Sequence, residues 1–185
     1  MTPVEYVQLK AFARVDGAWV ALLWAGSFAC YVAGLANPML SMLALLLALI
    51  SPFFIARRLR AFRDEARDGV ISFLRGWAFV ILVFFYGGLL FALMQYGYFA
   101  YMDRGYMLQS LHQMMSTPEA EAMLKQYGMG QAMAESLQQL QSMRPIDMAL
   151  NVLTMLIMLG VVLGLPIAAL MRNPKQDSPD LGAHQ

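Results

Sequence analysis

Charged residues, cysteine and histidine are all scarce in this sequence. Charged residues make up 14% of its 185 residues, whereas an average soluble domain has about 25%. The single cysteine, Cys30, excludes an internal disulfide, and its place in an apolar run favours a packing role. The two histidines, His112 and His184, lie far apart in the chain, and the sequence has no Gly-rich phosphate loop and no His-x-x-Glu-His metal helix. We therefore predict that the protein is not an enzyme and that it holds no metal and no cofactor.

Hydrophobic residues, by contrast, make up 59% of the chain and are concentrated in long uncharged runs. Each run is long enough to cross a bilayer as a helix. A basic start before the first run also fits a secretory signal peptide, but the run is long for one and a second run follows after a short turn. We predict an all-α integral membrane four-helix bundle, with spans at about 18–35, 39–56, 77–101 and 148–171.

Basic residues are distributed unevenly between the segments that flank these spans. With four spans, both termini share a side with the loop 57–76, and that side has ten basic residues: Lys10, Arg14, Arg57, Arg58, Arg60, Arg63, Arg67, Arg75, Arg172 and Lys175. The other side has three, which are Arg104, Lys125 and Arg144. The positive-inside rule therefore predicts that both termini and the basic loop are cytoplasmic. The net charge of +1 gives no reason to expect nucleic acid as a partner.

The segment 102–145, between the third and fourth spans, has the periodicity of two or three short amphipathic helices. We predict that it forms an extracytoplasmic helical insertion. It contains eight of the sixteen methionines and His112, which leaves three interpretations open: a copper(I) site, a Met-lined groove for a lipid or partner helix, or plain packing. The polar tail 173–185 is predicted to be disordered.

The interiors of the predicted spans contain no charged residue, which argues against a pump that uses a buried carboxylate relay. Gln95 and Asn151 are the strongly polar exceptions, and we expect them to form hydrogen bonds between helices. Small residues recur at a spacing of four in the first and fourth spans, and such ridges permit close helix approach within the bundle or in a dimer. The candidate packing residues are Gly26, Gly34, Gly160, Gly164, Gln95 and Asn151.

The loop 57–76 is the most charged part of the chain, with acidic residues alternating with arginines at helical spacing. We expect the second helix to continue beyond the membrane and to turn near Asp68 and Gly69. The loop holds the densest set of polar groups, so it is the first place to look for contact with a partner or an anionic lipid headgroup. The candidate residues are Arg60, Arg63, Asp64, Arg67 and Asp68.

The same loop contains a recognisable pattern: Phe62-Arg63-Asp64, then Gly69, Ile71-Ser72-Phe73 and Gly76. This pattern resembles the domain-of-unknown-function 4199 family, small four-span membrane proteins common in the Bacteroides group of bacteria. The resemblance covers about residues 10 to 175 and implies a location in the bacterial inner (cytoplasmic) membrane. The family has no established activity, so it implies no catalytic residue. Genes of this family near membrane glycosyltransferase genes favour an accessory role.

Two functional hypotheses follow from the sequence. In the first, the protein is a non-enzymatic accessory or interaction subunit that binds another membrane protein, for example a lipid-linked glycosyltransferase, or a second copy of itself. In the second, it binds or transports a lipid or small molecule through the Met-rich extracytoplasmic helices. A tightly filled bundle without a lateral opening would argue against the second hypothesis.

Overall fold

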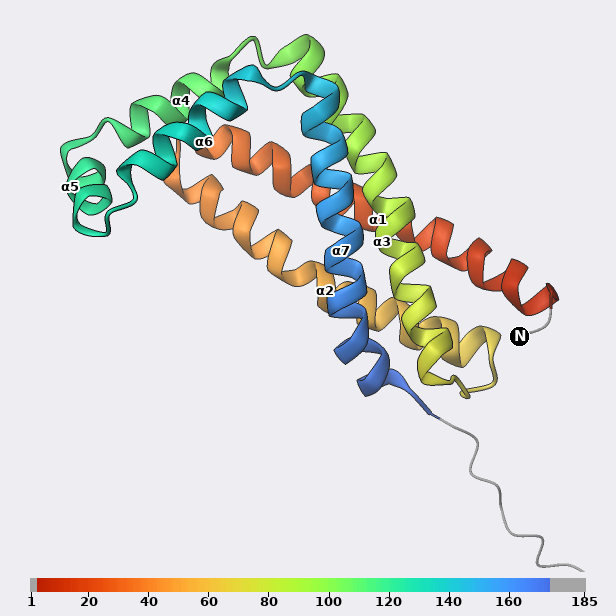
Figure 1. The fold of residues 1–185 in the computed structure, drawn as a ribbon. Helices are drawn as coiled ribbons and strands as arrows, with labels where there is room; N and C mark the ends of the chain where they lie inside the picture. Colours follow the sequence, from red (N-terminus) through yellow and green to blue (C-terminus); the bar gives the residue numbers. More distant parts are fainter. Residues whose placement is uncertain (1–2, 174–185) are drawn as a thin grey trace, which may run out of the picture.

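The computed structural model describes residues 3–173, and over these residues the chain is built from helices (Figure 1). Their bounds are α1 (Pro3–Gly34), α2 (Pro38–Ala66), α3 (Phe73–Gly97), a π-helix η1 (Tyr98–Met102), α4 (Tyr106–Met115), α5 (Pro118–Gln126), α6 (Gly130–Ser142) and α7 (Pro145–Met171). The predicted tail lies almost wholly outside the described residues.

Four stretches of helix are long and apolar enough to cross a membrane: Val4–Gly34, Pro38–Ala66, Phe73–Met102 and Pro145–Met171. This confirms the all-α membrane fold class. The first helix is longer than the predicted span at its N-terminal side, because α1 begins at Pro3 and continues without a break to Gly34. It therefore contains Asp16, a carboxylate that lies outside the predicted span 18–35.

Helix α3 is the centre of the bundle, packed between α1 and α7. Its core side chains are almost completely buried: Phe79, Val80, Val83 and Phe84 are at most 1% exposed. The backbones of α1 and α3 meet where Gly17 faces Gly87, since a Cβ atom built on Gly17 would lie 2.9 Å from the Gly87 nitrogen. Only glycine allows this approach, so the pair sets where α1 crosses α3.

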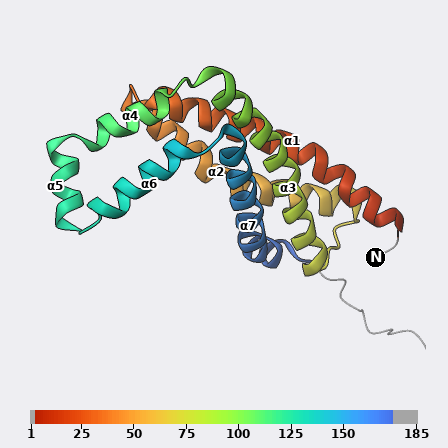
Figure 2. The ribbon, with the colours of Figure 1, turned by 45° about the horizontal axis from the view of Figure 1, so that its top comes forward.

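Helix α2 packs mainly against α1 and makes few contacts with α3 and α7. Figures 1 and 2 show that the α1–α2 hairpin leans away from α7. This hairpin and the second hairpin, formed by α3 and α7, diverge toward the end of the bundle where α4 begins. Long apolar side chains of α2 therefore remain exposed, among them Met39, Met42, Leu45 and Phe53. In a membrane such a surface faces lipid or another protein.

Helices α4, α5 and α6 form a separate arm that projects sideways over the turn between α1 and α2 (Figure 1). Three short helices form, as the periodicity of the segment predicted. Thr117 caps α5 by accepting a hydrogen bond from the Ala120 N–H at 3.4 Å, and Pro118 follows at the first helical position. Leu137 is the one buried side chain in these helices, all of whose residues are described. The arm is thus held mainly by its own helices.

The opposite end of the bundle contains the loop between α2 and α3, the N-terminal part of α1 and the last residues of α7. The predicted turn is confirmed, because Asp68 and Gly69 have φ angles of 50° and 78° directly after α2 ends. Ile71 and Asn173 exchange backbone hydrogen bonds of 3.0 and 3.1 Å. We call this part of the molecule the terminal end, and the part that carries α4–α6 the arm end.

Candidate functional site

The charged side chains of the terminal end bind mostly to other parts of the fold. Arg67 and Arg75 each donate to one carboxylate oxygen of Glu5, at 2.9 and 3.0 Å. Glu5 lies in α1, Arg67 directly follows α2 and Arg75 lies in α3. Glu5 therefore joins these three helices. The guanidinium groups of both arginines are thereby committed to an internal contact.

Arg63 makes a similar internal contact, this time to α7. Its Nη1 donates to the Met171 carbonyl at 3.2 Å, and its Nε donates to Asp64 at 2.7 Å. Asn173 continues the same connection by donating to the Gly69 carbonyl at 2.8 Å. Of the predicted contact residues, Arg60 and Asp68 are exposed, whereas Arg63 and Arg67 are partly buried.

Asp16 pairs with Arg58 at 2.5 Å inside the terminal end. Its side chain is 1% exposed, and its second oxygen, Oδ2, has no hydrogen-bond partner among the described residues. Asp16 is buried because it lies on the buried face of α1, where residues follow one another at intervals of three or four. The other residues of this stripe are Leu9, Ala13, Val20 and Trp24. Breaking such a buried pair on one side leaves an uncompensated charge.

Residues of the pattern that suggested the family have structural roles here. The Phe62 ring stacks on Phe79 with centroids 4.9 Å apart, and Ile71 is 1% exposed. A Cβ atom on Gly76 would lie 3.4 Å from the Ala168 side chain, so this glycine marks a close approach of α3 to α7. The pattern therefore joins the loop to the bundle.

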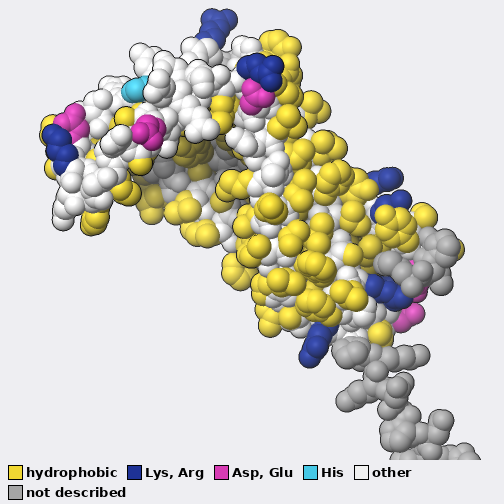
Figure 3. Space-filling view, viewed as in Figure 1, with side chains coloured by type: hydrophobic (Ala, Val, Ile, Leu, Met, Phe, Trp, Pro, Cys, Tyr) yellow, Lys and Arg dark blue, Asp and Glu magenta, His cyan; other side chains and the backbone are white. Residues whose placement is uncertain are grey.

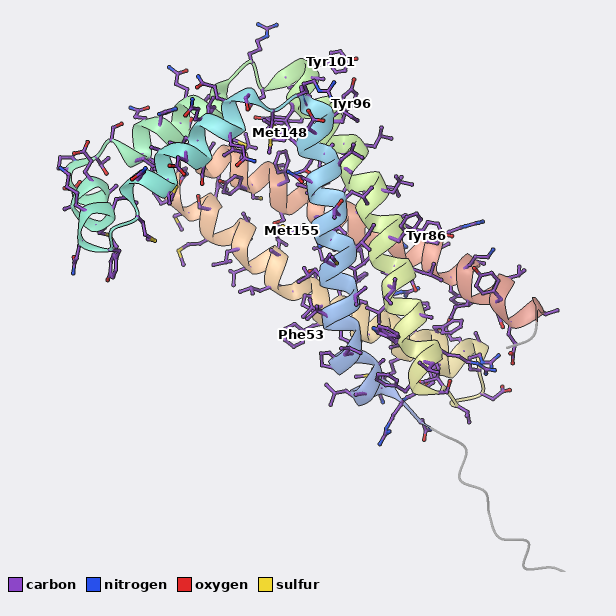
Figure 4. The ribbon with its side chains drawn as sticks, viewed as in Figure 1. Phe53, Tyr86, Tyr96, Tyr101, Met148 and Met155 are labelled. Atoms are coloured by element: carbon purple, nitrogen blue, oxygen red, sulfur yellow. The ribbon has the colours of Figure 1, made fainter. Side chains whose placement is uncertain are left out.

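A cavity of about 420 Å³ lies at the arm end, bounded by α1, the end of α3, η1, the arm and the start of α7. The surface is hollowed below the arm (Figure 3), and Met148 lies at the end of α7 nearest the arm (Figure 4). Most of its wall is apolar. The lining residues are Phe28, Gln95, Phe99, Asp103, Gly105, Met107, Leu108, Leu111, Leu140, Gln141, Met143, Pro145, Met148, Asn151 and Val152.

Aromatic rings build one side of this cavity. Phe28 of α1 makes edge-on contacts with Tyr98 and Phe99 of η1, at centroid distances of 5.2 and 6.0 Å, and with Phe91 of α3 at 6.1 Å. A π-helical turn changes the direction of the side chains that follow it, and such turns are frequent at functional sites. Here it turns Phe99 toward the cavity while Tyr98 contacts Asp103.

Asp103 is held in one position by three donors. The Tyr98 hydroxyl donates to Oδ1 at 3.0 Å, the Met107 N–H donates to Oδ1 at 3.1 Å and the Gly105 N–H donates to Oδ2 at 3.1 Å. Its side chain thereby caps the start of α4. Among the cavity-lining residues it is the one with a charged side chain.

Gln95 is the buried polar group of the cavity wall that the fold leaves unused. It is 6% exposed, and its Oε1 has no hydrogen-bond partner among the described residues. A buried acceptor without a partner costs about 1–3 kcal/mol. Gln95 and Asn151, which we expected to form hydrogen bonds between helices, both line the cavity, and that expectation stays a prediction.

The predicted small-residue positions differ in their surroundings. A Cβ atom on Gly160 would lie 2.6 Å from the Phe84 Cβ, and one on Gly164 would lie 2.8 Å from Cδ1 of Trp77, so α3 packs directly on these glycines of α7. Gly34 lies against Ser41 of α2, whereas Gly26 has no neighbour within 4 Å. The ridge on α7 thus faces the inside of the bundle.

A second hollow, of about 270 Å³, lies between α4 and α6. His112 and Met115 line it together with Ser116, Gly130, Ala134, Leu137, Gln138 and Gln141. The other methionines of the arm line the main cavity or lie on the exposed surface. Of the residues that could bind copper(I), this hollow therefore brings together one methionine, Met115, and one histidine, His112.

Sequence reasoning missed two features, the buried Asp16 and the cavity itself. Asp16 was detectable, because it falls on an apolar stripe that continues through the predicted span. The cavity was not, because its wall joins residues as distant in the chain as Phe28 and Val152.

No curated protein and no solved structure matches the chain. Residues 16–173 match a family model described as "Protein of unknown function (DUF4199)", and the chain therefore belongs to this family.

Proposed function

We propose that this multi-pass membrane protein binds an amphiphilic molecule, a lipid or a lipid-like compound, in the cavity under the arm. The observation that carries the proposal is a largely apolar cavity whose wall contains a buried amide oxygen, Gln95 Oε1, without a hydrogen-bond partner among the described residues. Its volume of about 420 Å³ lies within the range of about 300–1,000 Å³ that is typical of small-molecule sites. An apolar wall with a few polar groups suits a ligand that has one apolar part and one polar part.

The divergence of α2 and α7 supports entry from the side. These helices lie apart at the arm end (Figures 1 and 2), and both carry exposed apolar residues, such as Met42 and Leu46 of α2 and Met155 of α7. A ligand already dissolved in the bilayer would reach the cavity without crossing water. The arm covers the opening on the aqueous side.

Filling the cavity tests this proposal. We expect Leu111→Trp to reduce lipid retained by the purified protein severalfold, because Leu111 lines the cavity and indole is much larger than isobutyl. Met114→Trp is the matched control, since Met114 lies on the same helix, is 58% exposed and is not part of the wall. The measurement is native mass spectrometry of bound lipid. The proposal would be contradicted if wild-type protein retained no lipid on purification and bound none when lipid was added.

The proposal includes an orientation: the arm is extracytoplasmic, both termini are cytoplasmic, and the membrane is a bacterial inner membrane. Its support is the excess of basic residues on the side of the terminal end. In a Cys30→Ser background, we expect an impermeant maleimide to label Ser116→Cys on spheroplasts and to leave Glu65→Cys unlabelled, since both positions are exposed. The reverse pattern would place the arm in the cytoplasm.

A second candidate function is that of an accessory subunit, bound to another membrane protein such as a lipid-linked glycosyltransferase, or to a second copy. The specific support is α2, which packs mainly on α1 and exposes much of its apolar surface. At the terminal end, Arg60 and Asp68 are the predicted contact residues most available to a partner. We expect Arg60→Ala with Asp68→Ala to weaken association while insertion is kept. A protein that always purifies alone from its own membrane would contradict this role.

A further inference from the structure

The cavity under the arm contains an amide that the described fold does not bind. Gln95 lies in the last turn of α3, next to η1, and its oxygen is both shielded from water and without a partner. Buried polar groups are nearly always hydrogen-bonded, so an exception in a cavity wall points to a missing donor. The terminal torsion of a Gln side chain has a broad energy profile. Its amide can therefore turn toward a ligand at little cost.

The charge of the wall restricts what the donor can be. Asp103 is the one charged residue of the wall, and its three hydrogen bonds keep both carboxylate oxygens in place. No lysine or arginine lines the cavity to balance an anion. A phosphate or carboxylate head inside the cavity would be repelled by Asp103. A quaternary ammonium head has no hydrogen to donate to Gln95.

We propose that the cavity selects amphiphiles with an uncharged hydroxyl-bearing head, and that Gln95 recognises the hydroxyl. A hydroxyl both donates and accepts, and an amide offers both an acceptor oxygen and donor hydrogens, so the two groups match whichever way the amide is turned. The apolar chain lies along the aromatic and methionine side chains of the wall, such as Phe28, Phe99 and Met148. This inference rests on the proposed function and names the ligand class of that site.

Three probes with the same oleoyl chain test this selectivity: monoolein with two hydroxyls, methyl oleate with none, and oleate with a negative charge. Binding to the full chain is measured by native mass spectrometry. We expect wild-type protein to bind monoolein about five- to tenfold more tightly than methyl oleate, the range of one net hydrogen bond. Oleate should bind no better than methyl oleate.

Gln95→Leu should remove the preference for monoolein over methyl oleate, and binding of methyl oleate by this variant shows that it is folded. Gln139→Leu is the matched control, because Gln139 is exposed on α6 and does not line the cavity; it should keep the wild-type preference. Equal binding of monoolein and methyl oleate by wild-type protein, or a preference that survives in Gln95→Leu, would overturn the inference while the proposed function stands. If none of the three probes binds, the proposed function fails as well.

Discussion

The two ends of the molecule are held together by contacts of different range. At the terminal end, several side-chain hydrogen bonds join residues that are 42 to 108 positions apart, such as Arg58 with Asp16 and Arg63 with Met171. At the arm end, the side-chain hydrogen bonds of η1, the arm and the start of α7 join close neighbours, such as Tyr98 with Asp103 and Arg144 with Asp147, five and three positions apart. Distant contacts hold separate helices in place, whereas local contacts stabilise only the helix or turn that contains them.

This difference separates a rigid end from an adaptable one. Paired charges join α1, α2 and α3 at the terminal end, and Arg63 joins α2 to the Met171 carbonyl of α7. The apolar core of this end is continuous with that of the bundle. The arm has one buried side chain, and the wall below it carries an unused amide. The proposed lipid site lies at the end with less buried surface, where local opening costs less.

The largest expected effect concerns the buried ion pair at the terminal end. Asp16→Leu should lower the free energy of unfolding by about 3 kcal/mol, because Arg58 loses its partner in a partly buried position. The measurement is unfolding of the purified protein by added sodium dodecyl sulfate. Adding Arg58→Leu to the same protein should restore most of the loss, since no unpaired charge then remains. Equal stability of Asp16→Leu and wild type would contradict the rigid role of this end.

A smaller effect should show how far the rigid packing extends along α7. Gly160→Ala should destabilise the protein by about 2 kcal/mol, because the new methyl group would overlap Phe84, which is 1% exposed. Gly26→Ala is the matched control, since nothing lies within 4 Å of its position, and it should be neutral or slightly stabilising. The measurement is the same unfolding titration. Equal losses in both variants would contradict a specific role for the contact between Gly160 and Phe84.

The smallest effect compares one ion pair from each end. Glu5→Gln should cost about 1 kcal/mol, because it weakens contacts with Arg67 and Arg75 that are only partly exposed. Asp147→Asn should shift the apparent melting temperature much less, since its partner Arg144 lies three positions away and is 76% exposed. Both are measured by thermal unfolding in one detergent. A larger shift for Asp147→Asn than for Glu5→Gln would overturn the comparison.

Much of the fold was predictable because it depends on local patterns. Uncharged runs predicted four long apolar helices, and Asp68 with Gly69 predicted the turn after α2. Helix α1 extends well beyond the predicted span 18–35 on its N-terminal side. A charged residue does not end a helix when it can be paired, and Arg58 pairs with Asp16. The stripe from Leu9 to Trp24 was the better guide to the length of α1.

The candidate site was predictable only in part. The periodicity of the segment 102–145 indicated helices with apolar faces that need cover, and its methionines allowed a lipid groove as one of three interpretations. Gln95 was singled out as polar, but its role depends on its surroundings. Whether an amide in a membrane helix meets another helix or a cavity is decided by how the helices cross, which local sequence does not encode.

The sequence by itself determined that this is an all-α membrane protein, since apolar length and helical periodicity follow from backbone hydrogen bonding in a bilayer. It also determined the family, since residues 16–173 match the family model. Only the tertiary structure decided that Glu5, Arg67 and Arg75 meet, and that Phe28, Gln95 and Met148 surround one cavity. The physical reason is the divergence of two helix hairpins, which depends on the close approach of Gly17 to Gly87 and on the charged contacts that join the helices at one end.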